Sequence, residues 1–396
     1  MKPGMKSVTN IVLYTLTCFL VISTAFVTGY LARTIQAPVA AQTVSFSVFW
    51  EVWDLVNAHF YGDASDNTAR TYGAIEGSLI PLQDPYTVFV EPREREREQE
   101  ELRGSFGGIG AWVEQRTDGR IVLTPMEGRP AEKAGILAGD ELVAVDGKTI
   151  TDDMSLDQVV SMVKGEAGKI VTLTIRRQGR DDLLIFDVRR EEIVTESVVW
   201  RPLEQDATIG YIQLKMFNER TNDELEQAIK ALRELGAETF IVDLRDNGGG
   251  LLSSAVDVTS QFLSDGIVLY DSKGNGEETS YPVRDRGLAY DDPIAILVNG
   301  NTASASEIVA GAIQDRERGK LIGTQTFGKA SVQLLFDLSD GSSLHVTNAH
   351  WLTPNRRDIN GLGLTPDIIV NIADQDRQNG QDPQLQAAVI ELQGYH

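Results

Sequence analysis

Two serines and a lysine in the last third of the chain are the residue types that covalent catalysis needs. Ser304 and Ser306 lie in residues 298–315 (VNGNTASASEIVAGAIQD), and Lys329 lies in residues 326–333 (TFGKASVQ). A serine nucleophile requires a base to take its proton and N–H donors for the oxyanion that forms. The two segments therefore offer two candidate nucleophiles and one candidate base.

The flanking residues suit these roles. Small residues surround Ser304, so a substrate backbone could approach closely, and residues 307–312 favour a helix whose start would present free N–H groups. A lysine acts as a base only when it is neutral, which requires burial or a nearby positive potential. The apolar flanks of Lys329 predict such burial; they are Leu321, Ile322, Phe327 and Val332.

The elements before this region alternate between strand and helix patterns. Apolar runs predict strands at 209–214, 240–244 and 294–298, and helical spacing predicts helices at 222–235 and 255–263. This order favours an α/β core with a partly parallel sheet. The loop 243–250 (DLRDNGGG) follows its strand directly, but no Gly-Lys-Ser/Thr follows it, so it is not a phosphate loop.

A separate unit precedes the core. It begins with the glycine-rich loop 106–110 (FGGIG) and continues through apolar strand patterns to an amphipathic helix at 156–164 and strands at 171–176 and 183–188. Upstream of it, helices are expected at 45–60 and 69–80, and the charged run 93–103 is expected to be a solvated helix.

The core resembles the carboxyl-terminal processing (tail-specific) proteases, a serine peptidase family. The resemblance rests on residues 302–307 (TASASE), 327–329 (FGK) and Gln333, and it extends from about Phe46 to the C-terminus. It implies Ser304 as nucleophile, Lys329 as base and Gln333 as its assistant. It also implies an oxyanion hole formed by Gly249 or Gly250 together with the N–H of Ala305. The chain departs from the family at 355–357 (NRR), which affects local loop shape only.

The preceding unit resembles a PDZ domain. Consecutive N–H groups in such a loop can hold a terminal carboxylate, while the peptide adds as a strand to the domain edge. The resemblance implies that the loop contributes Gly107, Gly108, Ile109 and Gly110, and that the helix contributes Leu156, Val159 and Val163. Protein or peptide substrates with free, apolar C-termini are the expected partners, and a homo-oligomer stays open.

Composition and the N-terminus bear on partners and location. A formal net charge of −22 would repel phosphate backbones, so nucleic acid is not an expected partner. Residues 11–32 carry no charge and would span about 33 Å as a helix. Because Lys2 and Lys6 precede this run, we expect a membrane anchor with the catalytic body outside the cytoplasm. Residues 39–41 (VAA) keep signal cleavage and secretion open as the alternative.

The expected fold class is multi-domain α/β, with an N-terminal transmembrane helix, a helical segment, a mainly β PDZ domain and an α/β serine-protease core. The boundaries are expected as follows: cytoplasmic segment 1–10, anchor or signal 11–32, linker 33–44, helical region 45–103, PDZ domain 104–190, protease core 191–375 and C-terminal tail with a short helix 376–396.

Three other chemistries compete with this reading. A Ser-His-Asp hydrolase could use His345 or His350, but no Gly-x-Ser-x-Gly is present. Residues 161–164 (SMVK) form a Ser-x-x-Lys, without the Ser-Asp-Asn or Lys-Thr-Gly that penicillin-recognising enzymes carry. No His-Glu-x-x-His occurs, so we expect neither a metal nor another cofactor. A catalytically inactive, membrane-tethered PDZ scaffold stays open as a different class of function.

Overall fold

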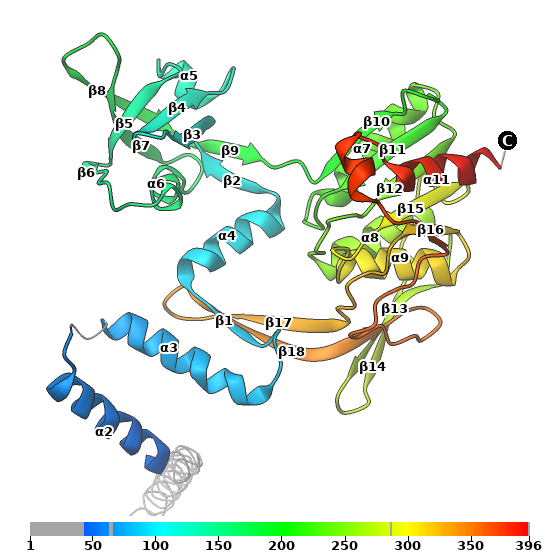
Figure 1. Ribbon diagram of the computed structural model, residues 1–396, viewed down its shortest axis with the longest axis horizontal. Helices are drawn as coiled ribbons and strands as arrows, with labels where there is room; N and C mark the ends of the chain where they lie inside the picture. Colours follow the sequence, from blue (N-terminus) through cyan, green and yellow to red (C-terminus); the bar gives the residue numbers. More distant parts are fainter. Residues whose placement is uncertain (1–42, 63–65, 286, 395–396) are drawn as a thin grey trace, which may run out of the picture. The chain divides into compact units, whose positions relative to one another are not determined.

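The computed structural model describes residues 43–62, 66–285 and 287–394 (Figure 1). The chain divides into two compact units, Met1–Ala74 and Ile75–His396. The described part of the first unit contains helix α2 (Thr43–His59) and the beginning of α3 (Asn67–Leu79). Both helices were expected. The aromatic rings of α2 pack on one another, with Phe49 and Trp50 at 5.1 Å, whereas Phe46 and Trp50 are exposed.

The second unit begins with elements that lead to the PDZ-like domain. After α3 come the 3-10 helix η1 (Ile80–Leu82), strand β1 (Val88–Val90) and helix α4 (Pro92–Arg103). Pro92 opens α4 and Gly104, at φ 72°, ends it, as expected for a left-handed helix cap. The expectation that α4 is a solvated helix is wrong at Arg95, which is buried. The charge of its guanidinium is balanced there by the carboxylates of Glu98 and Asp337.

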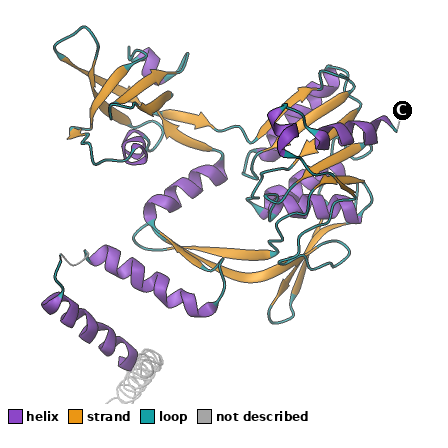
Figure 2. Ribbon diagram, viewed as in Figure 1, coloured by secondary structure: helices purple, strands orange, loops and turns teal. Residues whose placement is uncertain are grey.

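The PDZ-like domain consists of a sheet, a two-stranded ribbon and two helices (Figure 2). Its strands lie in the order β3-β4-β5-β7-β8, with β6 beside β5, while β2 pairs with β9. A closed apolar core of residues such as Leu123, Val159 and Leu173 fills it. The elements are β2 (Ser105–Gly108), β3 (Ala111–Gln115), β4 (Ile121–Pro125), α5 (Pro130–Lys133), β5 (Asp140–Val145), β6 (Lys148–Thr149), α6 (Leu156–Val163), β7 (Ile170–Arg176), β8 (Leu183–Arg189) and β9 (Glu191–Val194).

The remaining chain contains the predicted α/β core. Its sheet has the order β10-β11-β12-β15-β16-β19; β10 is antiparallel and the other neighbours are parallel. Strands β12 and β15 are buried throughout, as expected for parallel strands covered on both faces. The elements are β10 (Val198–Pro202), β11 (Ile209–Leu214), α7 (Thr221–Glu234), β12 (Thr239–Asp243), α8 (Leu252–Phe262), β15 (Ile294–Val298), α9 (Ala305–Asp315), β16 (Gly319–Gly323), β19 (Ile368–Ile369), α10 (Asp374–Gln378) and α11 (Pro383–Gln393).

Alternate residues of these strands enter two apolar clusters. Phe240 and Val242 of β12 pack in the cluster that includes α7, α8 and α9. Ile241, between them, packs with Ala388 and Leu392 of α11 in a second cluster. Because successive side chains point to opposite faces of the sheet, β12 packs against helices on both faces. This is the layered α/β arrangement that the sequence predicted.

A second sheet carries the residues that follow Lys329. Its order is β1-β18-β13-β14, and β17 pairs with β18. The strands are β13 (Ile267–Lys273), β14 (Glu278–Pro282), β17 (Ser331–Asp337) and β18 (Ser343–Leu352). Because β1 lies against β18, it brings the turn at Asp84 and Tyr86 toward this sheet.

The membrane anchor expected at residues 11–32 lies outside the described residues. Across residues 43–62, 66–285 and 287–394, no helix is both long enough and apolar enough to cross a bilayer.

Candidate active site

Ser304 sits in a strained turn between a buried strand and a helix. It follows β15 and immediately precedes α9, at φ 56° and ψ −117°. A non-glycine residue with this backbone is unfavourable and persists only when its surroundings impose it, as they often do at active sites. Ser304 is half-buried. The turn therefore presents a serine at the carboxyl end of the sheet, although the sequence carries no Gly-x-Ser-x-Gly.

Ser306, the other candidate nucleophile, is fully buried. Its hydroxyl donates to the backbone oxygen of Asn247 at 2.9 Å. This bond ties the first turn of α9 to the glycine-rich loop after β12. Ser306 is thus held inside the fold, and Ser304 is the more accessible of the two.

The carboxylate of Glu307 joins the segments that carry Ser304 and Lys329. Its Oε2 accepts from the backbone N–H of Ser304 at 3.0 Å and from that of Lys329 at 2.9 Å. Its Oε1 accepts from the N–H of Gly328 at 2.7 Å and from the Thr326 hydroxyl at 2.5 Å. Glu307 is fully buried. One oxygen atom therefore bridges the backbones of the candidate nucleophile and the candidate base.

The side chain of Lys329 is half-buried against an aromatic ring. Its Nζ lies 4.7 Å from the ring centroid of Tyr86. Burial lowers the pKa of Lys329 below its ordinary value, while the negative charge of Asp84 raises it in opposition. Among the described residues no hydrogen bond joins Ser304 Oγ to Lys329 Nζ, and such contacts often tighten only when substrate is bound. Phe327, one of the flanks expected to be buried with the lysine, is itself exposed.

Asp84 is held as a carboxylate near the lysine. Burial works against its charge, but hydrogen bonds from Thr347, Thr87 and two backbone N–H groups keep the pKa of Asp84 below its ordinary value. Asp84 is therefore ionised wherever Lys329 could titrate, and its charge favours the protonated lysine.

We expect Asp84→Asn to move the acidic limb of the pH profile of kcat/KM to lower pH. Removing the negative charge removes the contribution that raises the pKa of Lys329, so the neutral amine is populated at lower pH. The measurement is kcat/KM for a peptide substrate across pH, with exposed Asp223→Asn as the matched control. A limb that stays in place, or moves to higher pH, would contradict the link between Asp84 and the base.

Gln333 does not contact Lys329 directly. Its Nε2 donates to the hydroxyl of Thr347 at 3.3 Å, and a register shift in the β17–β18 pairing falls between Val332 and Gln333. Since Thr347 also contacts Asp84, Gln333 reaches the surroundings of the lysine through one intermediary. Among the described residues, no hydrogen bond joins Gln333 to Lys329, so any assistance to the lysine is indirect.

The glycine-rich loop lies against Ser304. A Cβ on Gly249 would come within 2.9 Å of the Ser304 Cβ, so only glycine fits there without displacement. The N–H of Gly249 is already used, because it donates to Asn247 Oδ1 at 2.9 Å. Gly250 forms a parallel bridge with Phe217, whose N–H and C=O bond to Gly249 and Leu251. In that pattern the N–H of Gly250 points away from Phe217.

The PDZ-like domain contains an apolar groove of about 210 Å³ beside its edge strand β3. Of the residues expected to bind peptide, four line it: Gly108, Ile109, Gly110 and Val163. The other three do not. Gly107 packs against Gly165, Val159 is fully buried in the domain core, and Leu156 packs on that core. Leu156 and Val159 face the domain core, Val163 both packs in that core and lines the groove, and Val160 and Lys164 line the groove as well.

The structure weighs against a histidine base at His345 and against a Ser-x-x-Lys site at Ser161. His345 Nε2 lies 3.3 Å from Ser343 Oγ and 3.2 Å from Glu98, but one ring nitrogen facing both groups cannot relay a proton between them, and Ser343 is fully buried. Ser161 donates to the backbone oxygen of Asp157, and Lys164 pairs with Glu100. Within the described residues, no group of three or more His, Cys, Asp or Glu could hold a metal ion.

Comparison with known proteins identifies the family. A model described as "Peptidase family S41" matches residues 208–370, and a PDZ domain model matches residues 121–177. A carboxy-terminal-processing protease of Bartonella bacilliformis is 36% identical over 352 residues, and this match covers 88% of this chain and 79% of the length of the Bartonella protein. The chain belongs to the carboxy-terminal processing proteases. It is a serine-type peptidase with a PDZ domain.

Further relatives of the protease extend over the same region. The carboxy-terminal processing protease CtpA of Bacillus subtilis is 32% identical over 353 residues, covering 89% of this chain and 74% of its own. A solved structure titled photosystem II D1 C-terminal processing protease is 32% identical, with a TM-score of 0.47, and covers 81% of this chain and 86% of its own.

Three supporting residues of the protease were not singled out from the sequence. Glu307 belongs to the TASASE motif, but its pattern indicated only a helix former. Asn247 is fully buried and its amide donates to the backbone oxygen of Leu214 at 2.8 Å, which fixes the glycine-rich loop on β11. Tyr86, in the turn DPYT, covers the lysine. The available signal was an Asn beside glycines and a Glu three residues after the serine, which is the spacing of a capping box.

Proposed function

We propose that Ser304 attacks the scissile carbonyl of a peptide and that neutral Lys329 accepts its proton. The lysine then donates this proton to the leaving amine, and water hydrolyses the acyl-enzyme ester to release Ser304. The observation that carries this proposal is the Glu307 bridge, since one oxygen binds the backbones of both residues. The half-burial of Lys329 lowers its pKa, as a lysine base requires.

We propose Gly250 and Ala305 as the oxyanion donors. The N–H of Ala305 is the first of helix α9, directly after the nucleophile. The Gly249 N–H is engaged by Asn247, which leaves Gly250 as the more suitable glycine. Gln333, in this proposal, steadies the lysine through Thr347 and Asp84 rather than by direct contact.

We propose that the groove of the PDZ domain selects substrates by a free, apolar C-terminus. Strand β3 is an edge strand and can accept a peptide as a further strand. The loop residues Ile109 and Gly110 line the groove, and Val160 and Val163 give it an apolar wall. Cleavage would then occur near the bound tail.

A peptide with a free C-terminus should be cleaved with a kcat/KM about ten- to a hundredfold above that of the same peptide amidated at its C-terminus. Losing a charge-assisted hydrogen bond costs roughly 1.5–3 kcal/mol. The measurement is a pair of matched peptides that end in valine, assayed under identical conditions. Equal kcat/KM values would mean that the PDZ domain does not read the terminus, while the serine–lysine chemistry would stand.

We also propose that residues 11–32 anchor the protease and that its catalytic body lies outside the cytoplasm. Lys2 and Lys6 before the uncharged run support this orientation. Protease added to intact spheroplasts should digest the body, and a cytoplasmic marker should survive as the control. Protection of the body in intact spheroplasts would reverse the orientation.

A further inference from the structure

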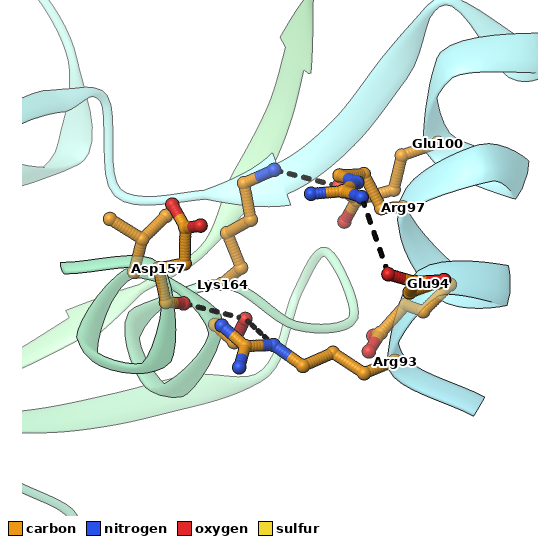
Figure 3. A pocket seen from close by; sticks show the side chains of 9 residues that line it. Arg93, Glu94, Arg97, Glu100, Asp157 and Lys164 are labelled. Carbon is orange, nitrogen blue, oxygen red and sulfur yellow. Dashed lines mark hydrogen bonds and ion pairs between the residues drawn. The ribbon is translucent and has the colours of Figure 1, made fainter. Parts of the chain in front are cut away.

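One lysine lies at the junction of two cavities in the PDZ region. Lys164 directly follows α6 and lines the peptide groove. It also lines a charged pocket of about 260 Å³ between α6 and α4 (Figure 3). In that pocket its Nζ donates to Glu100 Oε2 of α4 at 2.7 Å. The side chains of Lys164 and Glu100 are 29% and 17% exposed, so the pair is largely shielded from water.

The position of Lys164 is fixed next to the loop that would receive a peptide terminus. Its Nζ lies 4.1 Å from the ring centroid of Phe106, at the start of that loop. The N–H of Gly165 donates to the backbone oxygen of Gly107 at 3.1 Å. The end of α6 is held as well, because the buried Arg190 donates to the backbone oxygen of Val163 at 2.8 Å. The lysine cation is thus built into the loop end of the groove.

The groove itself is otherwise apolar where the terminus would lie. Ile109, Val160 and Val163 form its wall, and Lys164 is the one lysine or arginine among the described residues that line it. A terminal carboxylate entering this end loses water and needs a cation or N–H donors to compensate. In the free protein the carboxylate of Glu100 already pairs with the Lys164 cation.

We propose that Lys164 binds the terminal carboxylate of the substrate and that Glu100 is an internal competitor which the substrate must displace. The proposal rests on the tail recognition proposed above and assigns its charge selectivity to one residue. Exchanging one carboxylate for another keeps the lysine paired throughout, so the exchange has little net electrostatic cost. Because Glu100 lies on α4, tail binding releases one contact between α4 and the PDZ domain, whereas the hydrogen bond from Arg93 to Ser161 can remain.

The test uses the full chain carrying Ser304→Ala, so that peptides bind without being cleaved. A short fluorescein-labelled peptide ending in valine, with either a free or an amidated C-terminus, is titrated by fluorescence anisotropy. Lys164→Met keeps the aliphatic stem against Phe106 but removes the charge. It should weaken binding of the free-acid peptide roughly ten- to a hundredfold and leave the amidated peptide unchanged.

Glu100→Gln should have the opposite effect. Without the competing carboxylate, the free-acid peptide should bind about two- to fivefold more tightly, and the amidated peptide should not change. Glu101→Gln is the matched control, since Glu101 is exposed on the same helix. Lys164→Arg should restore most of the preference for the free acid, which a purely structural lysine would not require.

Any of four results would contradict the proposal in whole or in part. Equal weakening of both peptides by Lys164→Met would show that the lysine only supports the domain. Unchanged free-acid affinity in Glu100→Gln would show that Glu100 does not compete. If the unsubstituted PDZ domain shows no preference for the free acid, tail recognition itself fails and this proposal falls with it. A preference that persists in Lys164→Met refutes the role of Lys164 alone.

Discussion

Replacing Ser304 with alanine is expected to lower kcat for peptide hydrolysis about 10³-fold or more, and Lys329→Ala should lower it to a similar extent. The first change removes the atom that forms the acyl-enzyme, and the second removes the group that takes and returns the proton. Because the two residues act as one unit, the double variant should be hardly slower than either single variant.

Ser306→Ala is the matched control for this prediction. Its hydroxyl binds Asn247 inside the fold, so its loss should cost about 1 kcal/mol of stability and leave most of the activity. A fluorophosphonate probe should label the unsubstituted protease at Ser304, and Lys329→Ala should be labelled much more slowly. An inactive Ser306→Ala with an active Ser304→Ala would reverse the assignment. No labelling of the unsubstituted protein would favour the inactive PDZ scaffold.

Features of this site that depend on local sequence patterns could be predicted, and features that depend on contacts between distant segments could not. The strand and helix that flank Ser304 were predicted, because the apolar run of β15 and the helical pattern of α9 are local signals. The layered α/β core was predicted for the same reason. The strained backbone of Ser304 was not, because the φ and ψ of a single residue leave no periodic signal in the sequence.

The assignment of groove residues was partly wrong because the apolar pattern of α6 covers both its core face and its groove face. Leu156 and Val159 were expected to line the groove, but they face the domain core. Val160 and Lys164, which were not expected there, line the groove instead. The burial of Lys329 was predicted correctly from four apolar flanks, of which Phe327 is exposed. The ring that covers the amine, Tyr86 from a distant turn, was not predicted. Tertiary contacts of this kind leave no periodic signal.

Replacing Glu307 should impair catalysis strongly, although its side chain takes no part in the proposed proton transfer. Its carboxylate accepts four hydrogen bonds, from the backbones of Ser304, Gly328 and Lys329 and from the Thr326 hydroxyl. Glu307→Gln keeps the shape but turns one acceptor into a donor that faces other donors. We expect kcat to fall about a hundredfold, since a displacement of about 1 Å between reacting groups can cost that much.

Stability should change as well, and the two effects can be separated. Buried donors left without an acceptor cost about 1–3 kcal/mol each, and each oxygen of Glu307 accepts from two donors. Glu307→Gln should therefore lower the free energy of unfolding by about 2–6 kcal/mol. The catalytic loss is therefore measured well below the unfolding transition, as the rate at which a fluorophosphonate phosphonylates Ser304 with loss of fluoride. Glu234→Gln, exposed on α7, should change neither quantity. A folded Glu307→Gln variant that is phosphonylated at the unsubstituted rate would show that the bridge between nucleophile and base supports the fold without positioning the reaction.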